Sequence, residues 1–348
     1  MKLLVSALEH SANIHLKSVA KHLGDDVEFI GIFDNSLGES IIDLRSLSIM
    51  GFVDALKKLP FFFKLNNQMV QLAQEADKIL LIDSSGFNLP LAKKIKKKYP
   101  NKEIIYYILP QAWAWKKKRI VVLQQVVDTL CSILPFEPSY YPKEANISYV
   151  GHPLLDQIST FKQTLNKEVK QVLFMPGSRK GEIKKLMPIY HEVRKKLPHI
   201  EALLVIPPFF TQEEKTELYG DTKEFTLKTN AHQAMLEADF AFICSGTATL
   251  EASLIGIPFI LTYIAKPFDF FIAKNLVKIE YIGLANIMFK HMNKEPLHPE
   301  FLQEDVTATN LLKEFQNYNR ENFLENSKIL REYLKHGSSE VVAKIILQ

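Results

Sequence analysis

The segment MPGSR at residues 175–179 combines residue types that can bind a phosphate group. It follows an apolar run typical of a buried strand and precedes a helical pattern. At such a junction backbone N–H groups point at a bound anion, and a guanidinium can pair with phosphate through two hydrogen bonds. The predicted anion-binding residues are Pro176, Gly177, Ser178 and Arg179. A plain turn is the alternative, and the spacing matches neither a dinucleotide-binding glycine pattern nor a P-loop.

A second turn of small residues, CSGT at residues 244–247, also lies between an apolar run and a helical pattern. Ser245, Gly246 and Thr247 can offer backbone and hydroxyl donors to a second phosphate. Glu251, one helical turn later, can accept hydrogen bonds from a ribose diol. Together the two turns would hold a diphosphate. The alternative is an ordinary N-cap followed by an acid that the helix dipole favours.

In the first half of the chain, polar residues follow three apolar runs, at residues 8–11, 83–88 and 110–115. Asp83 ends a buried run, where desolvation can raise the pKa of a carboxylate and make it a useful general base. The alternative for Asp83 is an N-cap of the next helix. We expect these strand ends to face a ligand cleft. The further candidates to line it are Glu9, Ser11, Asn88, Trp113 and His152, although an isolated histidine is more often structural. We find no metalloprotease, paired His–Asp or nucleophile-elbow motif, so no metal site is predicted.

Apolar runs and helical patterns alternate along almost the whole chain, which is the signature of βαβ units. A polar helical connector at residues 154–169 interrupts the alternation, and residues 314–348 are helical. We therefore predict an α/β protein with two doubly wound Rossmann-like domains, a cleft between them and a helical C-terminal tail. The predicted bounds are 1–165, 166–313 and 314–348, the last packing back across the domains.

The composition is ordinary for a globular protein, with 47% hydrophobic and 24% charged residues, and it allows two cores. Cys131 and Cys244 lie in apolar runs, which disfavours a disulfide framework or a cysteine metal site. Residues 1–10 are too short for a signal-peptide core, and the apolar run 255–265 is broken by Gly256 and Pro258. We expect a cytoplasmic protein with no membrane span and no nucleic-acid partner.

Basic clusters at residues 93–98 and 116–119 accompany the aromatic tract Phe61, Phe62 and Phe63. Lysines beside bulky rings suit an anionic membrane surface, because the charges attract the surface and the rings partition into its interface. The alternative is a solvated helix face together with core phenylalanines.

Taken together, these segments resemble the lipid-A-disaccharide synthases, inverting glycosyltransferases of the GT-B type. The segments that carry the resemblance span nearly the whole chain: IMGFVDAL at 49–56, IDSSGFN at 82–88, AWAWK at 112–116, LPFE at 134–137, VGHP at 150–153, MPGSR at 175–179, SGTATLE at 245–251, KPF at 266–268 and PEFLQE at 299–304. Each is unspecific alone, whereas their order and joint spacing are specific.

The resemblance implies transfer of 2,3-diacylglucosamine from UDP-2,3-diacylglucosamine to 2,3-diacylglucosamine 1-phosphate, which gives a β-1,6-linked disaccharide 1-phosphate and UDP. It implies that Asp83 is the catalytic base, that Gln303 joins the donor site, and that no metal or other cofactor is needed. Phe61, Phe62 and Phe63 would contact the inner face of the cytoplasmic membrane, where the acylated substrates reside, and a homodimer is possible.

Two loops depart from the family pattern. Residues 8–13 read LEHSAN where Gly-Glu-x-Ser-Gly-Asp is typical, and Ser85 and Gly86 replace a proline and a second acid after Asp83. The alternatives are another UDP-sugar enzyme of the same fold, such as an N-acetylglucosaminyltransferase or an epimerase, and a two-lobed solute-binding protein. The Trp-Ala-Trp and Gly-His-Pro segments count against the first alternative, and the lack of an export signal counts against the second.

Overall fold

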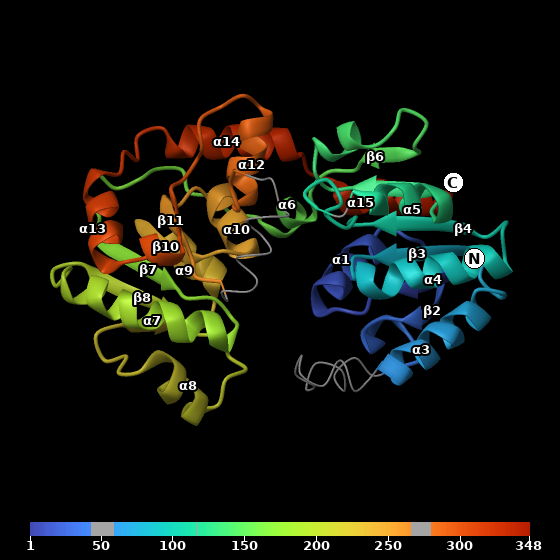
Figure 1. Ribbon diagram of the computed structural model, residues 1–348, viewed down its shortest axis with the longest axis horizontal. Coiled ribbons are helices and arrows are strands. Elements are labelled where there is room, and N and C mark those ends of the chain that lie inside the picture. Colours follow the sequence, from blue (N-terminus) through green and yellow to red (C-terminus); the bar gives the residue numbers. More distant parts are fainter. Residues whose placement is uncertain (43–58, 116, 266–279) are drawn as a thin grey trace. The chain divides into compact units, whose positions relative to one another are not determined.

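The computed structural model describes residues 1–42, 59–115, 117–265 and 280–348, which form two compact units (Figure 1). Met1–Gln157 and Leu334–Gln348 make the first unit, and Ile158–Tyr333 make the second. The segments at 49–56 and 266–268 and the residue Lys116 lie outside the described residues. Each unit contains a six-stranded sheet with helices around it, so the predicted α/β class with two doubly wound domains is confirmed.

The sheet of the first unit is parallel throughout and has the order β2-β1-β3-β4-β5-β6. Its strands are β1 (Lys2–Ser6), β2 (Glu28–Ile32), β3 (Lys78–Ile82), β4 (Glu103–Tyr107), β5 (Thr129–Ser132) and β6 (Ile147–Tyr149). The central strands are apolar at nearly every position, because helices cover both faces of the sheet.

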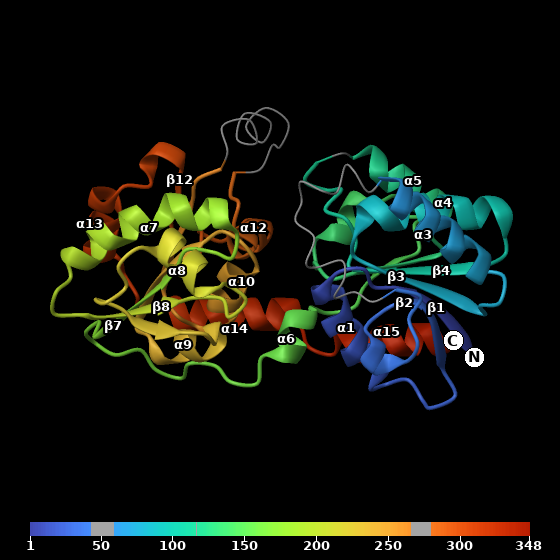
Figure 2. The same ribbon diagram turned by 90° about the horizontal axis from the view of Figure 1, so that it is seen from below.

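Two layers of helices flank this sheet (Figure 2). The first layer has α3 (Leu59–Leu72), α4 (Ser85–Lys98) and α5 (Lys118–Val126), whose apolar faces share one core cluster. The second has α1 (His10–Ala20) and α15 (Ser338–Leu347), which pack against each other in the other cluster, and α15 also contacts α6 (Pro153–Gln157). The described part of this unit also has the short 3₁₀ turns η1 (Asn35–Leu37) and η4 (Glu137–Tyr140). The C-terminal helix thus belongs to the core of the first unit.

The second unit repeats the arrangement with the strand order β12-β11-β10-β7-β8-β9, again parallel. Its strands are β7 (Gln171–Met175), β8 (Glu201–Val205), β9 (Thr226–Lys228), β10 (Phe240–Cys244), β11 (Phe259–Tyr263) and β12 (Glu300–Leu302). Its helices are α7 (Lys180–Lys195), α8 (Gln212–Tyr219), α9 (Ala231–Glu237), α10 (Thr247–Ile255), α12 (Leu284–His291), α13 (Ala308–Asn317) and α14 (Phe323–Leu334), with the turn η5 (Gln303–Asp305).

An aromatic core lies under the neighbouring strands β7 and β10. The ring of Phe174 stacks on that of Phe242 with centroids 5.4 Å apart, and Tyr190 from α7 packs on both rings. The Tyr190 hydroxyl lies 2.7 Å from Oγ1 of Thr262, so its polar end is hydrogen-bonded although it is fully buried. This packing fixes the carboxyl ends of the two strands relative to each other.

No helix within the described ranges is both long and apolar enough to cross a membrane.

Candidate functional site

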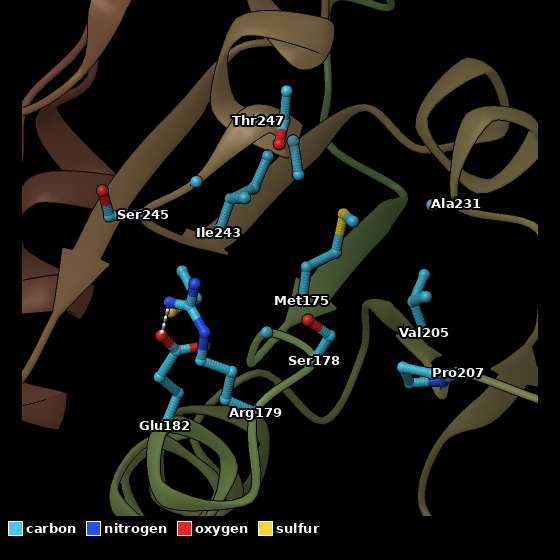
Figure 3. Close-up of a pocket in the computed structure, with 14 residues that line it drawn as sticks. Met175, Ser178, Arg179, Glu182, Val205, Pro207, Ala231, Ile243, Ser245 and Thr247 are labelled. Carbon is cyan, nitrogen blue, oxygen red and sulfur yellow. Dashed lines mark hydrogen bonds and ion pairs between the residues drawn. The ribbon is translucent and has the colours of Figure 1, made fainter. Parts of the chain in front are cut away.

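The two loops with predicted phosphate-binding residues begin on strands that pair directly. β10 pairs with β7, and Ile243 lies opposite Met175 at the ends of the two strands. The loops that follow therefore start side by side, and they line one open cavity of about 310 Å³ (Figure 3). Gly177, Ser178 and Arg179 line it from the first loop. Ser245, Gly246 and Thr247 line it from the second.

Two helices begin at this cavity. Arg179 is the N-cap of α7 and Gly246 is the N-cap of α10, and neither has a side-chain hydrogen bond that caps the helix. The first-turn N–H groups of a helix have no partner within the helix, and they carry the positive end of its dipole. Two such ends beside one cavity favour an anion there.

Gly177 is required by the geometry of the first loop. Its φ of +98° lies in the left-handed region, which residues with a side chain rarely adopt. A Cβ at this position would lie 2.7 Å from Oε2 of Glu182 and 3.3 Å from Sγ of Cys244. A larger residue would therefore strain the loop and push on the wall of the cavity.

Arg179 lies at the rim of the cavity and is held by Glu182, one turn along α7. Nη1 of Arg179 donates a 2.9 Å hydrogen bond to Oε1 of Glu182, as Figure 3 shows. This bond raises the pKa of Arg179 above its ordinary value. The arginine side chain is 80% exposed and that of Glu182 only 13%. The carboxylate thus acts as a fixed anchor, and the other guanidinium donors remain for a ligand.

Glu182 was not among the residues selected from the sequence. It lines the same cavity as Arg179, and its carboxylate decides where the guanidinium is held. The signal that could have identified it is its position three residues after Arg179, because residues three apart lie on the same face of a helix.

The remaining donor candidates do not line the cavity. Pro176 lies between two lining residues, and Glu251 follows on α10, where its Oε1 is 3.2 Å from Nδ1 of His232. Gln303 follows β12, which is separated from β10 by β11. Its φ of +54° is uncommon for a residue with a side chain.

Asp83 of the first unit lies in a strained turn directly after β3. Asp83 and Ser84 have φ values of +51° and +41°. The turn is held through the main-chain oxygen of Asp83, which accepts 2.8 Å and 2.5 Å hydrogen bonds from Nδ2 of Asn88 and from the hydroxyl of Tyr106. The N-cap of α4 is Ser84, so the alternative in which Asp83 is simply an N-cap is wrong.

Asn88 is fully buried, and its polar atoms contact protein groups. Its Oδ1 accepts a 2.6 Å hydrogen bond from the Ser6 hydroxyl, and its Nδ2 donates to the main-chain oxygens of Ile82 and Asp83. Asn88 therefore ties the ends of β1 and β3 together and positions Asp83.

Glu9 lies beside Asp83, because β1 and β3 are neighbours in the sheet. Oε1 of Glu9 accepts a 3.0 Å hydrogen bond from the Ser84 hydroxyl. Burial raises the pKa of Asp83, and the negative charge of Glu9 raises it further. Ser11 lies in the first turn of α1 and is exposed. The pair Glu9 and Asp83 is thus an acidic site, and its half-buried member Asp83, with a raised pKa, is a stronger base than an exposed aspartate.

Trp113 and His152 belong to the packed interior of the first unit. The Trp113 ring contacts that of Phe136 edge to face at 4.9 Å. His152 is 5% exposed, and its Nδ1 accepts a 3.2 Å hydrogen bond from the backbone N–H of Leu154. Burial, with a contribution from His15, lowers the pKa of His152 to about 3. These contacts favour the structural interpretation of His152.

The aromatic tract on α3 has two exposed rings and one packed ring. Phe61 is 39% and Phe63 is 61% exposed, whereas Phe62 packs edge to face against Phe87 at 6.3 Å. Nζ of Lys94 lies 5.5 Å from the centre of the Phe63 ring, so one lysine of the basic cluster on α4 adjoins an exposed ring. Exposed rings beside lysines are the arrangement expected at a membrane interface. Phe61 and Phe63 fit this arrangement, whereas Phe62 is packed against the protein.

Within the part of the chain that the structure describes, no group of three or more His, Cys, Asp or Glu side chains could hold a metal ion.

Comparison with known proteins gives a consistent result. The family model described as lipid-A-disaccharide synthetase matches residues 3–345. The lipid-A-disaccharide synthase of Helicobacter pylori strain J99 is 49% identical over 354 residues, which cover 98% of this chain and 97% of the relative. That of Campylobacter jejuni strain RM1221 is 45% identical and covers 99% and 98%. The UDP-GlcNAc 2-epimerase of Neisseria meningitidis, solved with UDP-GlcNAc, has the same fold, with a TM-score of 0.63 at 11% identity over 100% of both chains.

Proposed function

The chain belongs to the lipid-A-disaccharide synthase family, and we propose how its residues carry out the transfer for which that family is named. It is a glycosyltransferase of lipid A biosynthesis that transfers 2,3-diacylglucosamine from UDP-2,3-diacylglucosamine to 2,3-diacylglucosamine 1-phosphate. The products are the β-1,6-linked disaccharide 1-phosphate and UDP. The observation that carries the site assignment is the pair of uncapped helix N-termini at one cavity, because UDP is a diphosphate that needs neutralising charge as it leaves.

The UDP part of the donor binds in the cavity of the second unit. The first-turn N–H groups of α7 and α10 donate to the diphosphate, and Arg179, held by Glu182 through Nη1, donates to a phosphate oxygen from its other N–H groups. Glu251 accepts hydrogen bonds from the ribose hydroxyls, and Gln303 contacts the donor from the end of β12, two strands from β10. The helix N–H groups and Arg179 supply the positive charge that a metal ion supplies in other transferases, so the reaction proceeds without a metal ion.

Asp83 removes the proton from the 6-hydroxyl of the acceptor. As that oxygen attacks the anomeric carbon of the donor, the bond from this carbon to the β-phosphate oxygen breaks and its electron pair leaves with UDP. The proton stays on Asp83 until it is lost to water. The raised pKa of Asp83 makes it a stronger base than an exposed aspartate.

Both substrates carry acyl chains, so the enzyme must meet them at a membrane. The exposed rings of Phe61 and Phe63, with Lys93, Lys97 and Lys98 on α4, form the contact with the inner face of the cytoplasmic membrane. Lys96 is bound to Asp128 and takes no part.

The test is to incubate the purified protein with the donor and the 1-phosphate acceptor in a neutral detergent and to analyse the products by mass spectrometry. We expect a disaccharide 1-phosphate and one equivalent of UDP, with or without a metal chelator. A parallel incubation with UDP-N-acetylglucosamine alone distinguishes an epimerase. Epimerised sugar nucleotide, or UDP release without a disaccharide, would contradict the proposed function.

A further inference from the structure

The guanidinium of Arg119 lies at the edge of the acceptor site. Arg119 is on the first turn of α5, and its Nη1 donates a 3.2 Å hydrogen bond to the hydroxyl of Ser85. Ser85 is the first residue of α4 and follows the catalytic Asp83 by two positions. Cζ of the guanidinium lies over the ring of Trp115, 5.9 Å from its centre. The arginine is thus held in place beside the start of α4.

The positive charge of Arg119 is not neutralised within the described part of the chain. Its side chain makes the hydrogen bond to Ser85 and the ring contact with Trp115, and neither partner is a carboxylate. A guanidinium has five N–H donors in a fixed plane, so most of them remain for a ligand. A half-buried cation that is oriented by two contacts, with no carboxylate partner among the residues that the structure describes, suits a bound anion.

The start of α4 has open space at Gly86, the residue after Ser85. A Cβ on Gly86 would meet no described atom within 4 Å. The N-cap Ser84 has no side-chain capping bond, and the N–H groups of Phe87 and Asn88 both donate to its main-chain oxygen. The N–H groups of Ser85 and Gly86 are therefore the ones that a ligand at this helix start could use. An anion there would receive hydrogen bonds from the guanidinium, from the Ser85 hydroxyl and from the helix start.

The carboxylates of Glu9 and Asp83 lie at the same strand ends and repel an anion. An anionic group of the acceptor is therefore directed to Arg119, and a neutral hydroxyl to Asp83. The acceptor of the proposed reaction has both groups, a phosphate at one end of the sugar and the attacking hydroxyl at the other. The site can orient such a molecule in one direction only.

We propose that Arg119, with Ser85 and the first turn of α4, forms the site that binds the 1-phosphate of the acceptor. The site recognises a phosphomonoester and holds the sugar so that its 6-hydroxyl reaches Asp83. This inference rests on the proposed function and adds the acceptor's phosphate recognition to it. The same chemistry would fit the phosphate of a membrane lipid headgroup, and the experiment distinguishes the two sources.

The experiment compares wild-type enzyme and Arg119→Gln on two acceptors, 2,3-diacylglucosamine 1-phosphate and the same sugar without phosphate. All rates are measured in neutral detergent micelles, which contain no anionic lipid. With the phosphorylated acceptor we expect the variant's acceptor KM to rise about tenfold to a hundredfold, as for the loss of a charge-assisted hydrogen bond. With the unphosphorylated acceptor we expect the two enzymes to agree within about twofold, and the donor KM to stay unchanged.

Lys143→Gln is the matched control, because Lys143 is an exposed cation of the same unit outside the proposed site. Arg119→Lys keeps the charge without the planar fork, so we expect it to recover part of the loss. A partly unfolded variant does not mimic the result, because unfolding lowers the rate on both acceptors equally.

An equal loss on both acceptors would overturn the proposal and assign Arg119 a structural role. A loss confined to binding of anionic vesicles, with unchanged kinetics in micelles, would overturn it in favour of a lipid headgroup. If the wild-type enzyme makes no disaccharide from either acceptor, the proposed function itself fails, and this result is distinct from both.

Discussion

Replacement of Asp83 by asparagine tests the acceptor side of the mechanism most directly. The hydrogen bonds from Asn88 and Tyr106 go to the main-chain oxygen of Asp83, so the substitution leaves them in place. An asparagine also tolerates the positive φ of this position. We therefore expect Asp83→Asn to fold normally and to bind UDP as the wild type does, which a thermal shift with UDP measures.

The expected loss is in turnover. General-base catalysis contributes about 10²- to 10⁴-fold, which corresponds to a barrier higher by about 3 to 5 kcal/mol. Initial rates of disaccharide formation at saturating donor and acceptor measure it. A variant that keeps more than about a tenth of the wild-type kcat would refute the assignment of Asp83 as the base.

The pH dependence of activity is a second test of the Asp83 carboxylate. A base works only when it is deprotonated, so activity falls as the pH drops through the raised pKa of Asp83. Glu9→Gln removes the negative charge that helps to raise this pKa, and the acid limb of kcat/KM should move to lower pH. An acid limb that stays in place, or moves to higher pH, would show that Glu9 does not act on the base.

Three further predictions concern the donor site, the membrane and the fold. Arg179→Ala should raise the donor KM about tenfold to a hundredfold and leave the acceptor KM unchanged in steady-state kinetics, and unchanged donor kinetics would exclude a phosphate contact. Replacing Phe61 and Phe63 by serine should weaken co-sedimentation with anionic vesicles at least tenfold, while activity in detergent persists. The control is Phe209→Ser, because Phe209 is an exposed phenylalanine of the other unit. Asn88→Ala leaves buried partners unpaired and should lower the free energy of unfolding by about 2 to 3 kcal/mol in urea titration, whereas a loss below about 0.5 kcal/mol would contradict its role in the turn.

The strand ends of both units were predictable because their signals are local. A run of apolar residues forms a strand covered on both faces, and the small residues after it form the turn, whatever the rest of the chain does. The alternation therefore predicted β7 and β10 and the loops with Arg179 and Thr247. The polar end of β3 at Asp83 was predictable for the same reason.

The sequence alone thus determined the fold class, the family and the loops that begin the two candidate sites. Tertiary structure decided which loops meet, because strand order places β7 beside β10 and β1 beside β3. It also decided which side chains reach a site. Phe62 packs inward between exposed neighbours, and the contact between Arg119 and Ser85 joins two helices through residues 34 positions apart in sequence. Sequence patterns report each residue's own preference for burial, whereas such contacts depend on how distant elements pack.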